Sequence, residues 1–229
     1  MTHLPKNVFD LKDLREKTRA FSDRIQAGEV LSTMLKLYKA SGALLLGIPA
    51  GGLPIAAVIR MQTALEMDVA VVSKITLPWN SEAGYGAVSF DGTVRLNQAM
   101  LAHLRLSESQ IQQGSEKTLH KVKRRTQLLR DSKPFPEVRH RSVVLVDDGL
   151  ASGFTMLAAV ESVKKAGAGA IAVAVPTGHL NAVQELAEQV NEVRLQLEVG
   201  DIRAQNGRHG DGRHHDGPWM SYGEPTRPT

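Results

Sequence analysis

Short, mostly apolar runs alternate along this chain with longer segments in which apolar residues recur at helical spacing. A short continuous apolar run is typical of a strand that is covered on both faces. Strands that alternate with helices predict a mostly parallel sheet with helices on both sides. The expected strands are 43–48, 69–73, 143–146, 170–175 and 193–197. The expected fold class is therefore α/β, with a mostly parallel central sheet flanked by helices.

Helical spacing and capping residues locate the segments between these strands. Ser22 or Asp23 is placed to cap the first helix, and Pro54 falls in the first turn of the second, where a missing N–H does no harm. Ser107 and Glu108 open a long helix. The expected helices are 22–38, 53–65, 97–103, 107–130, 154–166 and 180–190.

Residues 77–92 are rich in turn formers, and their later part alternates like a hairpin that turns at Asp91-Gly92. We interpret this segment as a hairpin that could close over a site as a mobile lid and exclude water. Asn80 and Glu82 are its candidate contacts with a substrate. A solvated Glu82 is an equally good interpretation.

The residues from 200 onwards differ in composition from the rest, because they are rich in Gly, His, Arg and Pro and lack apolar periodicity. We expect one α/β domain over residues 1–199 and an irregular tail over 200–229. The histidines of this tail, His209, His214 and His215, could bind a metal, but a solvated tail is the better interpretation.

The twenty residues from Ala40 to Ile59 carry no charge, which is the length of a membrane span. Pro49, Pro54 and several glycines interrupt the run, and a broken helix would leave backbone groups unpaired in lipid. A strand, a glycine turn and a helix explain the run better. The start of the chain also lacks the apolar stretch of a secretory signal. We expect a soluble, cytoplasmic protein without a membrane partner.

Composition narrows the chemistry further. The chain has no cysteine, which excludes disulfides, zinc-cysteine sites and thiol nucleophiles. Its net charge of +4 suits small anionic ligands. Its ten aromatic residues are too few to favour a base-stacking surface, and nucleic acid is not an expected partner. A basic run in the long helix could touch RNA, although a solvated helix face is the simpler interpretation. This run comprises Lys117, Lys121, Lys123, Arg124, Arg125 and Arg130.

The segment 143–155 gives the strongest local signal for chemistry. A buried strand delivers Asp147 and Asp148 to its carboxyl end, where ligands bind in open α/β sheets. A small-residue turn and the start of a helix follow, and their backbone N–H groups can surround a phosphate. Carboxylates beside a phosphate site fit a ligand that also carries hydroxyls or a magnesium ion, such as a phosphorylated sugar. The alternative is an ordinary strand-to-helix turn that Asp148 caps.

The same segment resembles the 5-phosphoribosyl-1-pyrophosphate (PRPP) motif of type I phosphoribosyltransferases. The resemblance implies that Asp147 and Asp148 form a catalytic acid pair that holds the ribose hydroxyls. It implies a magnesium ion held mainly through PRPP, with the acid pair as further candidate ligands. It also implies a site for the 5-phosphate at Leu150, Ala151, Ser152, Gly153, Phe154 and Thr155.

A second glycine turn, Gly47 to Pro54, follows the first buried strand. In the same family the corresponding turn holds pyrophosphate, which implies this role for Ala50, Gly51 and Gly52. Many relatives carry Arg where Ala50 stands, and Lys74 is the candidate to supply the missing charge. Residues 73–88 also look like a poorly characterised, phosphoribosyltransferase-like group of bacteria and archaea, and the similarity runs from about residue 21 to about 193.

The implied activity is transfer of a phosphoribosyl group from PRPP to a nitrogenous acceptor, a glycosyl transfer of nucleotide metabolism, by a homodimer. Some purine-specific relatives place an aspartate base where Ala151 stands, so a purine acceptor deprotonated in that way is disfavoured. The alternative is a regulatory protein that binds PRPP or a nucleotide and has lost transfer. A dinucleotide-dependent dehydrogenase is a distant third, because the turn at Gly47 lacks the G-x-G-x-x-G spacing.

Overall fold

The computed structural model describes residues 4–11 and 21–198. Its main element is a six-stranded sheet in the order β1-β9-β8-β7-β2-β3, in which every neighbouring pair is parallel. These strands are β1 (Val8–Asp10), β2 (Leu44–Gly47), β3 (Glu66–Val69), β7 (Val143–Val146), β8 (Ile171–His179) and β9 (Glu192–Glu198). The predicted α/β class and parallel sheet are confirmed.

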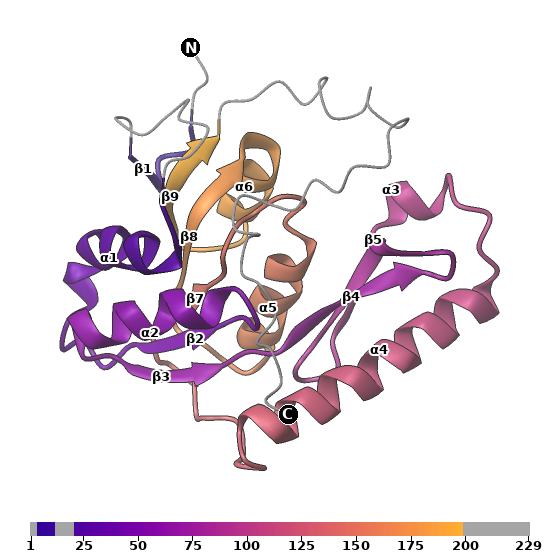
Figure 1. Cartoon of the computed structure of the whole chain (residues 1–229), viewed down its shortest axis with the longest axis horizontal. Coiled ribbons are helices and arrows are strands. Elements are labelled where there is room, and N and C mark those ends of the chain that lie inside the picture. Colours follow the sequence, from indigo (N-terminus) through magenta and orange to yellow (C-terminus); the bar gives the residue numbers. More distant parts are fainter. Residues whose placement is uncertain (1–3, 12–20, 199–229) are drawn as a thin grey trace, which may run out of the picture.

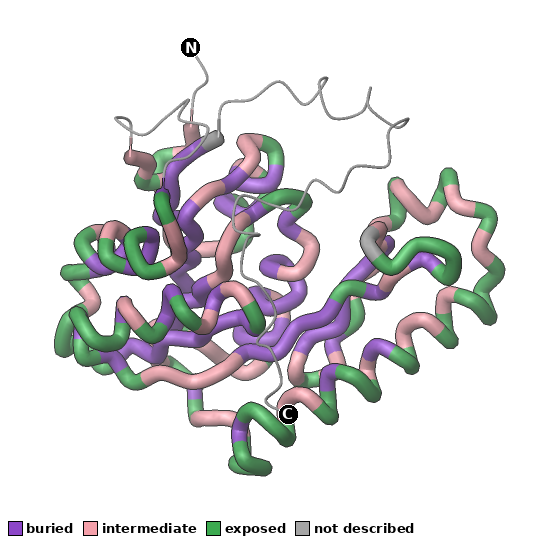
Figure 2. The backbone as a smooth tube through the Cα atoms, viewed as in Figure 1, coloured by how far each residue is buried: buried purple, intermediate pink, exposed green. Residues whose placement is uncertain are grey.

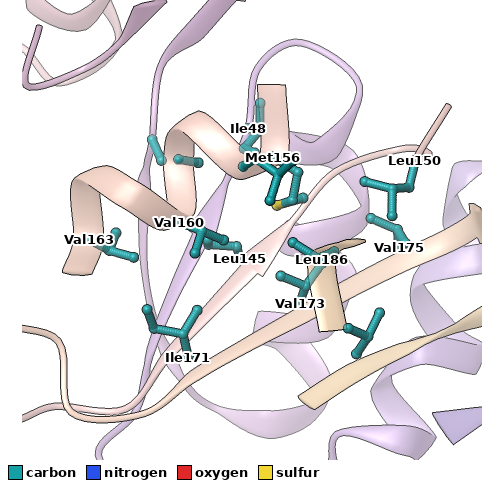
Figure 3. Close-up of a cluster of buried hydrophobic side chains, with 14 of the residues drawn as sticks. Ile48, Leu145, Leu150, Met156, Val160, Val163, Ile171, Val173, Val175 and Leu186 are labelled. Atoms are coloured by element: carbon teal, nitrogen blue, oxygen red, sulfur yellow. The ribbon is translucent and has the colours of Figure 1, made fainter. Parts of the chain in front are cut away.

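Helices cover both faces of this sheet (Figure 1). On one face α1 (Arg24–Met34) and α2 (Gly52–Thr63) pack on alternate residues of β2, β7 and β8. On the other face α5 (Phe154–Lys165) and α6 (Leu180–Ala187) cover the intervening strand residues, whose side chains point to the opposite side of the sheet. Figure 3 shows this second core, in which Leu145 and Val173 of the strands lie against Val160 of α5 and Leu186 of α6. Figure 2 shows the strands buried at the centre of the molecule.

A second, three-stranded antiparallel sheet extends from one side of this core (Figure 1). It consists of β4 (Val72–Leu77), β5 (Asn80–Ser89) and β6 (Val94–Leu96), followed by α3 (Gln98–Leu101) and α4 (Glu108–Leu129). Helix α5 contacts this sheet, and so does α4. A separate cluster of buried residues joins α4 to β4 and β5, namely Val71, Ile75, Leu77, Tyr85, Val88 and Val122. We call β4, β5, β6, α3 and α4 the arm.

Most predicted helix starts are confirmed, because short-range capping determines them. Asp23 rather than Ser22 caps α1, since its carboxylate accepts a hydrogen bond of 2.8 Å from the Gln26 N–H. Ser107 and Gln110 form a capping box at the start of α4. The predicted hairpin turn at Asp91 is confirmed as well. The Asp91 side chain accepts hydrogen bonds from Thr93 and from Ser162, which join the turn to α5.

Two predictions about the fold are wrong, and one strand was missed. Residues 69–73 are not one strand, because β3 ends at Val69 in the main sheet and β4 starts at Val72 in the arm. Strand β1, which pairs with β9, was not expected, since three residues are too few for a sequence pattern. Arg130 does not belong to a solvated face. Its side chain is 2% exposed, pairs with Asp68 and lies over the ring of Phe135.

The remaining expectations about segments have mixed outcomes. Residues 77–92 contain the end of β4, strand β5 and the turns on either side of it, so the predicted hairpin is confirmed, and whether it moves as a lid stays a prediction. The tail 200–229 lies outside the described residues, as do its histidines. Among residues 4–11 and 21–198, none of the helices has both the length and the apolar character that crossing a membrane requires.

Candidate active site

The two glycine turns singled out in the sequence lie against each other at the carboxyl edge of the sheet. Strands β2 and β7 are neighbours in register, with Gly47 opposite Val146, so the segments that follow them meet. The Ile48 N–H donates to the Val146 carbonyl at 2.8 Å. A Cβ on Gly52 would lie 2.4 Å from that carbonyl oxygen and 2.8 Å from Asp147 Cα. Only glycine leaves room for this approach.

Asp147 and Asp148 form a pair at the tip of β7, and both are half-buried. The Asp148 N–H donates to Asp147 Oδ1 at 2.8 Å. A Cβ on Gly51 would lie 1.8 Å from Asp148 Oδ2, so the carboxylate of one turn rests directly on the glycine of the other. The structure therefore unites the predicted ribose and pyrophosphate turns in one place.

Arg24, at the start of α1, is a member of this site that sequence reasoning missed. Its Nη2 donates to Asp148 Oδ2 at 2.7 Å, and both side chains are about one-third exposed. Arg24 is 124 residues away from Asp148 in sequence, and no local motif marks it. Only the packing of α1 beside the end of β7 reveals the pair. Arg24 thus places a positive charge beside the turn in which Ala50 stands.

Burial is the largest of the effects that raise the pKa of Asp147 to about 8, followed by the negative charge of Asp148 and a side-chain hydrogen bond with it. The positive charge of Lys74 acts in the opposite direction and lowers the pKa. Lys74 therefore lies close enough to the acid pair to influence it, although it belongs to β4 of the arm. A raised carboxyl pKa beside a second carboxylate is a common feature of functional sites.

The raised pKa of Asp147 predicts that this residue lowers the stability of the folded chain as the pH rises. The folded chain holds the Asp147 proton up to about pH 8, whereas an unfolded aspartate has a pKa of about 3.9 and releases its proton near that pH. The free energy of unfolding should therefore fall between these pH values. Asp147→Asn removes the carboxyl group and keeps the acceptor of the Asp148 N–H. We expect this variant to melt at a higher temperature than the natural chain, by a larger margin at pH 8 than at pH 5. Calorimetric melting at both pH values tests this, and an equal margin would contradict it.

The predicted phosphate turn has the form that anion binding requires. Gly153 has a positive φ of 75° and directly precedes α5, whose first turn has no side-chain cap. Within the described part of the chain, no acceptor is bound by the backbone N–H groups of residues 151–155. These N–H groups lie at a helix N-terminus, which favours negative charge. Ala151 and Ser152 are exposed, and Phe154 and Thr155 are partly buried.

Leu150 differs from the rest of this turn. Its N–H donates to the Thr177 carbonyl at 2.9 Å, and its own carbonyl accepts from the His179 N–H at 3.0 Å. Its side chain is buried in the core. Leu150 therefore anchors the turn to β8 and has no N–H left for a phosphate, so the predicted role at this residue is wrong.

The other predicted residues are placed as follows. Ala50 is exposed, and its peptide bond with Pro49 is cis. Lys74 is exposed on β4. Asn80 is exposed at the start of β5, where its side chain accepts a hydrogen bond from the Ala83 N–H. Glu82 lies in β5, and its side chain is outside the described part of the structure.

Comparisons with known proteins find similarity in sequence and in fold. The family model of the phosphoribosyl transferase domain matches residues 91–204. A curated Mycobacterium tuberculosis protein, provisionally named a phosphoribosyl transferase, is 31% identical over 175 residues, which cover 76% of this chain and 40% of that protein. The chain thus spans less than half the length of this relative. The crystal structure of TT1426 from Thermus thermophilus has a TM-score of 0.63 and 31% identity, covering 80% of this chain and 86% of that one.

Proposed function

The chain belongs to the phosphoribosyltransferase family, and from this premise we propose that it transfers the 5-phosphoribosyl group of PRPP to a nitrogenous acceptor and releases pyrophosphate. The observation that carries the proposal is the meeting of three features at one edge of the sheet. These are the Asp147–Asp148 pair, the amide-lined turn that opens α5, and the turn at Gly51 that lies against Asp148.

The proposed reaction breaks the bond between the anomeric carbon and the pyrophosphate oxygen, and it forms a bond from the acceptor nitrogen to the same carbon. Positive charge develops on the ribose while the bond breaks, and the negative charge of the acid pair at its hydroxyls stabilises that charge. The N–H groups of residues 151–155 hold the 5-phosphate and fix the sugar in place. Ala151 has no side chain that could take a proton from the acceptor, so this position supplies no general base.

The acid pair also suits a magnesium ion. Mg²⁺ prefers oxygen ligands, and it is usually bound through one or two carboxylates together with the phosphates of a substrate. Among the described residues, no three His, Asp or Glu side chains gather into a metal site of their own. Asp147 and Asp148 would therefore hold the ion jointly with PRPP, and the ion would neutralise the charge of the departing pyrophosphate.

Arg24 gives the proposal a test at a residue that no motif marks. The Arg24 guanidinium group fixes Asp148 and places positive charge beside the pyrophosphate turn. Arg24→Ala removes both effects. We expect the affinity for magnesium-PRPP to fall about tenfold, the usual effect of losing one charge-assisted hydrogen bond. Calorimetric titration measures this. Arg60→Ala is the matched control, since Arg60 is exposed in the last turn of α2 and its loss should leave the affinity unchanged. Equal affinities in all three proteins would contradict the role of Arg24.

Release of pyrophosphate from PRPP tests the function directly. The protein is incubated with PRPP and magnesium, alone and with a panel of nitrogenous bases, and pyrophosphate is measured by a coupled assay. Acceptor-dependent release supports the transferase. Saturable PRPP binding without release under any acceptor supports the second candidate, a PRPP-binding regulatory protein, which the alanines at positions 50 and 151 favour. No binding of PRPP would overturn both.

A further inference from the structure

The arm contains a groove that shares Lys74 with the proposed PRPP site but is otherwise lined by residues to which the proposed reaction gives no catalytic role. It lies between the hairpin of β4 and β5 and the helix α4, and it has a volume of about 740 Å³. Sites for small molecules commonly have volumes of about 300–1,000 Å³. The charged, aromatic and amide side chains that line this groove include Lys74, Trp79, Tyr85, Gln113, Lys117 and Lys121. We call it the arm groove.

Three positive charges face the arm groove without a counter-charge from the described residues that line it. Lys117 and Lys121 are four residues apart in α4, so they lie on one side of the helix, and Lys74 comes from β4. No acidic side chain among the described residues lines the groove. In that same part of the chain, none of the three lysines takes part in an ion pair. Such a cluster attracts an anionic ligand.

Two aromatic side chains, Trp79 and Tyr85, line the arm groove. Trp79, in the turn between β4 and β5, is 64% exposed, whereas tryptophan is highly buried on average. Tyr85 is itself buried and reaches the groove beside Gly114 of α4. A Cβ at position 114 would lie 2.2 Å from the Tyr85 hydroxyl oxygen. Glycine is disfavoured inside a helix, and here it makes room for this hydroxyl group. Burial raises the pKa of Tyr85, which keeps the hydroxyl a hydrogen-bond donor.

We propose that the arm groove is a second ligand site, which binds a small phosphate ester carrying a planar ring, of the size and chemistry of a nucleoside monophosphate. The lysine ammonium groups bind the phosphate, Trp79 stacks on the ring, and Gln113 and Tyr85 supply hydrogen bonds at its edge. Lys123 and Arg124 of the same helix are exposed but do not line the groove. A ligand confined to the groove therefore depends on Lys117 and Lys121 and is indifferent to the other two cations.

The tryptophan of the arm groove makes the binding measurable. The chain has two tryptophans, Trp79 and Trp219, so Trp219→Phe leaves Trp79 as the only one. In this background, AMP should change the Trp79 fluorescence in a saturable manner, whereas adenosine, which lacks the phosphate, should bind at least about tenfold more weakly. Absence of a saturable change with AMP up to millimolar concentration would overturn the proposal.

Matched variants then locate the site. Lys117→Gln with Lys121→Gln should weaken AMP binding about tenfold or more, and Lys123→Gln with Arg124→Gln, which removes the same charge, should leave it within about twofold. Equal loss in both pairs, together with tighter binding of single-stranded RNA than of AMP, would overturn the small-ligand site and favour a nucleic-acid surface. Circular dichroism and melting temperature establish that each variant is folded.

One further variant separates the arm groove from the proposed PRPP site. Asp147→Asn with Asp148→Asn should leave the AMP signal at Trp79 within about threefold, because the acid pair does not line the groove. Loss of this signal in the acid variant, with retention in the Lys117 and Lys121 variant, would place AMP in the PRPP site and overturn the proposal. The proposed transferase activity stands or falls separately, on pyrophosphate release.

Discussion

Replacing Asp147 and Asp148 together by asparagine is expected to lower the affinity for magnesium-PRPP by at least about 100-fold. Each carboxyl group of the pair is proposed to accept a hydrogen bond from a ribose hydroxyl, and a hydrogen bond to a charged group such as the Asp148 carboxylate is worth about 1.5–3 kcal/mol. Asparagine keeps the size of the side chain but removes the charge that also favours magnesium. Calorimetric titration of PRPP, with and without magnesium, measures the loss.

The acid variant should remain folded, since both side chains are only half-buried and removal of the Asp147 carboxyl group, whose pKa is raised, relieves the cost of burying its charge. Its melting temperature at pH 8 is therefore the necessary companion measurement. A folded variant that binds PRPP as tightly as the natural chain does would show that the acids do not hold the sugar. The proposed function would then lose its central observation.

Gly52→Ala is expected to have the second largest effect, on both stability and PRPP binding. The new Cβ would meet two backbone groups of the neighbouring turn, at 2.4 Å from the Val146 oxygen and 2.8 Å from Asp147 Cα. Backbone atoms cannot rotate away as the end of a side chain can, so α2 and the end of β7 must separate. Overpacking of this kind costs about 1–3 kcal/mol. It would also displace the acid pair from the pyrophosphate turn.

Gly149→Ala is the control for this prediction, because it adds the same methyl group within the same site. A Cβ at position 149 would have no neighbour closer than 3.7 Å, at Thr177 Oγ1. Thermal unfolding should show a markedly lower melting temperature for the Gly52 variant and a nearly unchanged one for the Gly149 variant. Similar melting temperatures in the two variants would mean that the two turns are not packed as closely as described.

Much of the main domain followed from short stretches of sequence. The strand 143–146 was predicted with the bounds that β7 has, and α5 starts at the predicted residue. Both depend on local rules, namely that a four-residue apolar run fits a buried strand and that a glycine turn precedes a helix. The caps Asp23 and Ser107 follow rules of the same range. The family profile then supported the resemblance to which these motifs pointed.

The mistakes have a common origin in contacts between distant parts of the chain. The apolar run 69–73 contains no sign that the chain passes from one sheet to another at residues 70 and 71. Arg130 has the sequence context of a solvated helix end, yet Asp68 and Phe135 enclose it. Arg24 joins the acid pair across 124 residues. In each case a partner far away in sequence decides the environment of the side chain.

The sequence alone determined which residues could perform chemistry, because the strand, the acidic pair and the glycine turn are neighbours along the chain and their geometry is local. The tertiary structure decided which of them act together. The parallel pairing of β2 with β7 brings Gly51 onto Asp148, and α1 adds Arg24. The packing of α4 on the hairpin likewise creates the arm groove from residues that have no common motif. Such contacts depend on how buried surfaces fit together across the whole chain, and no window of sequence contains that information.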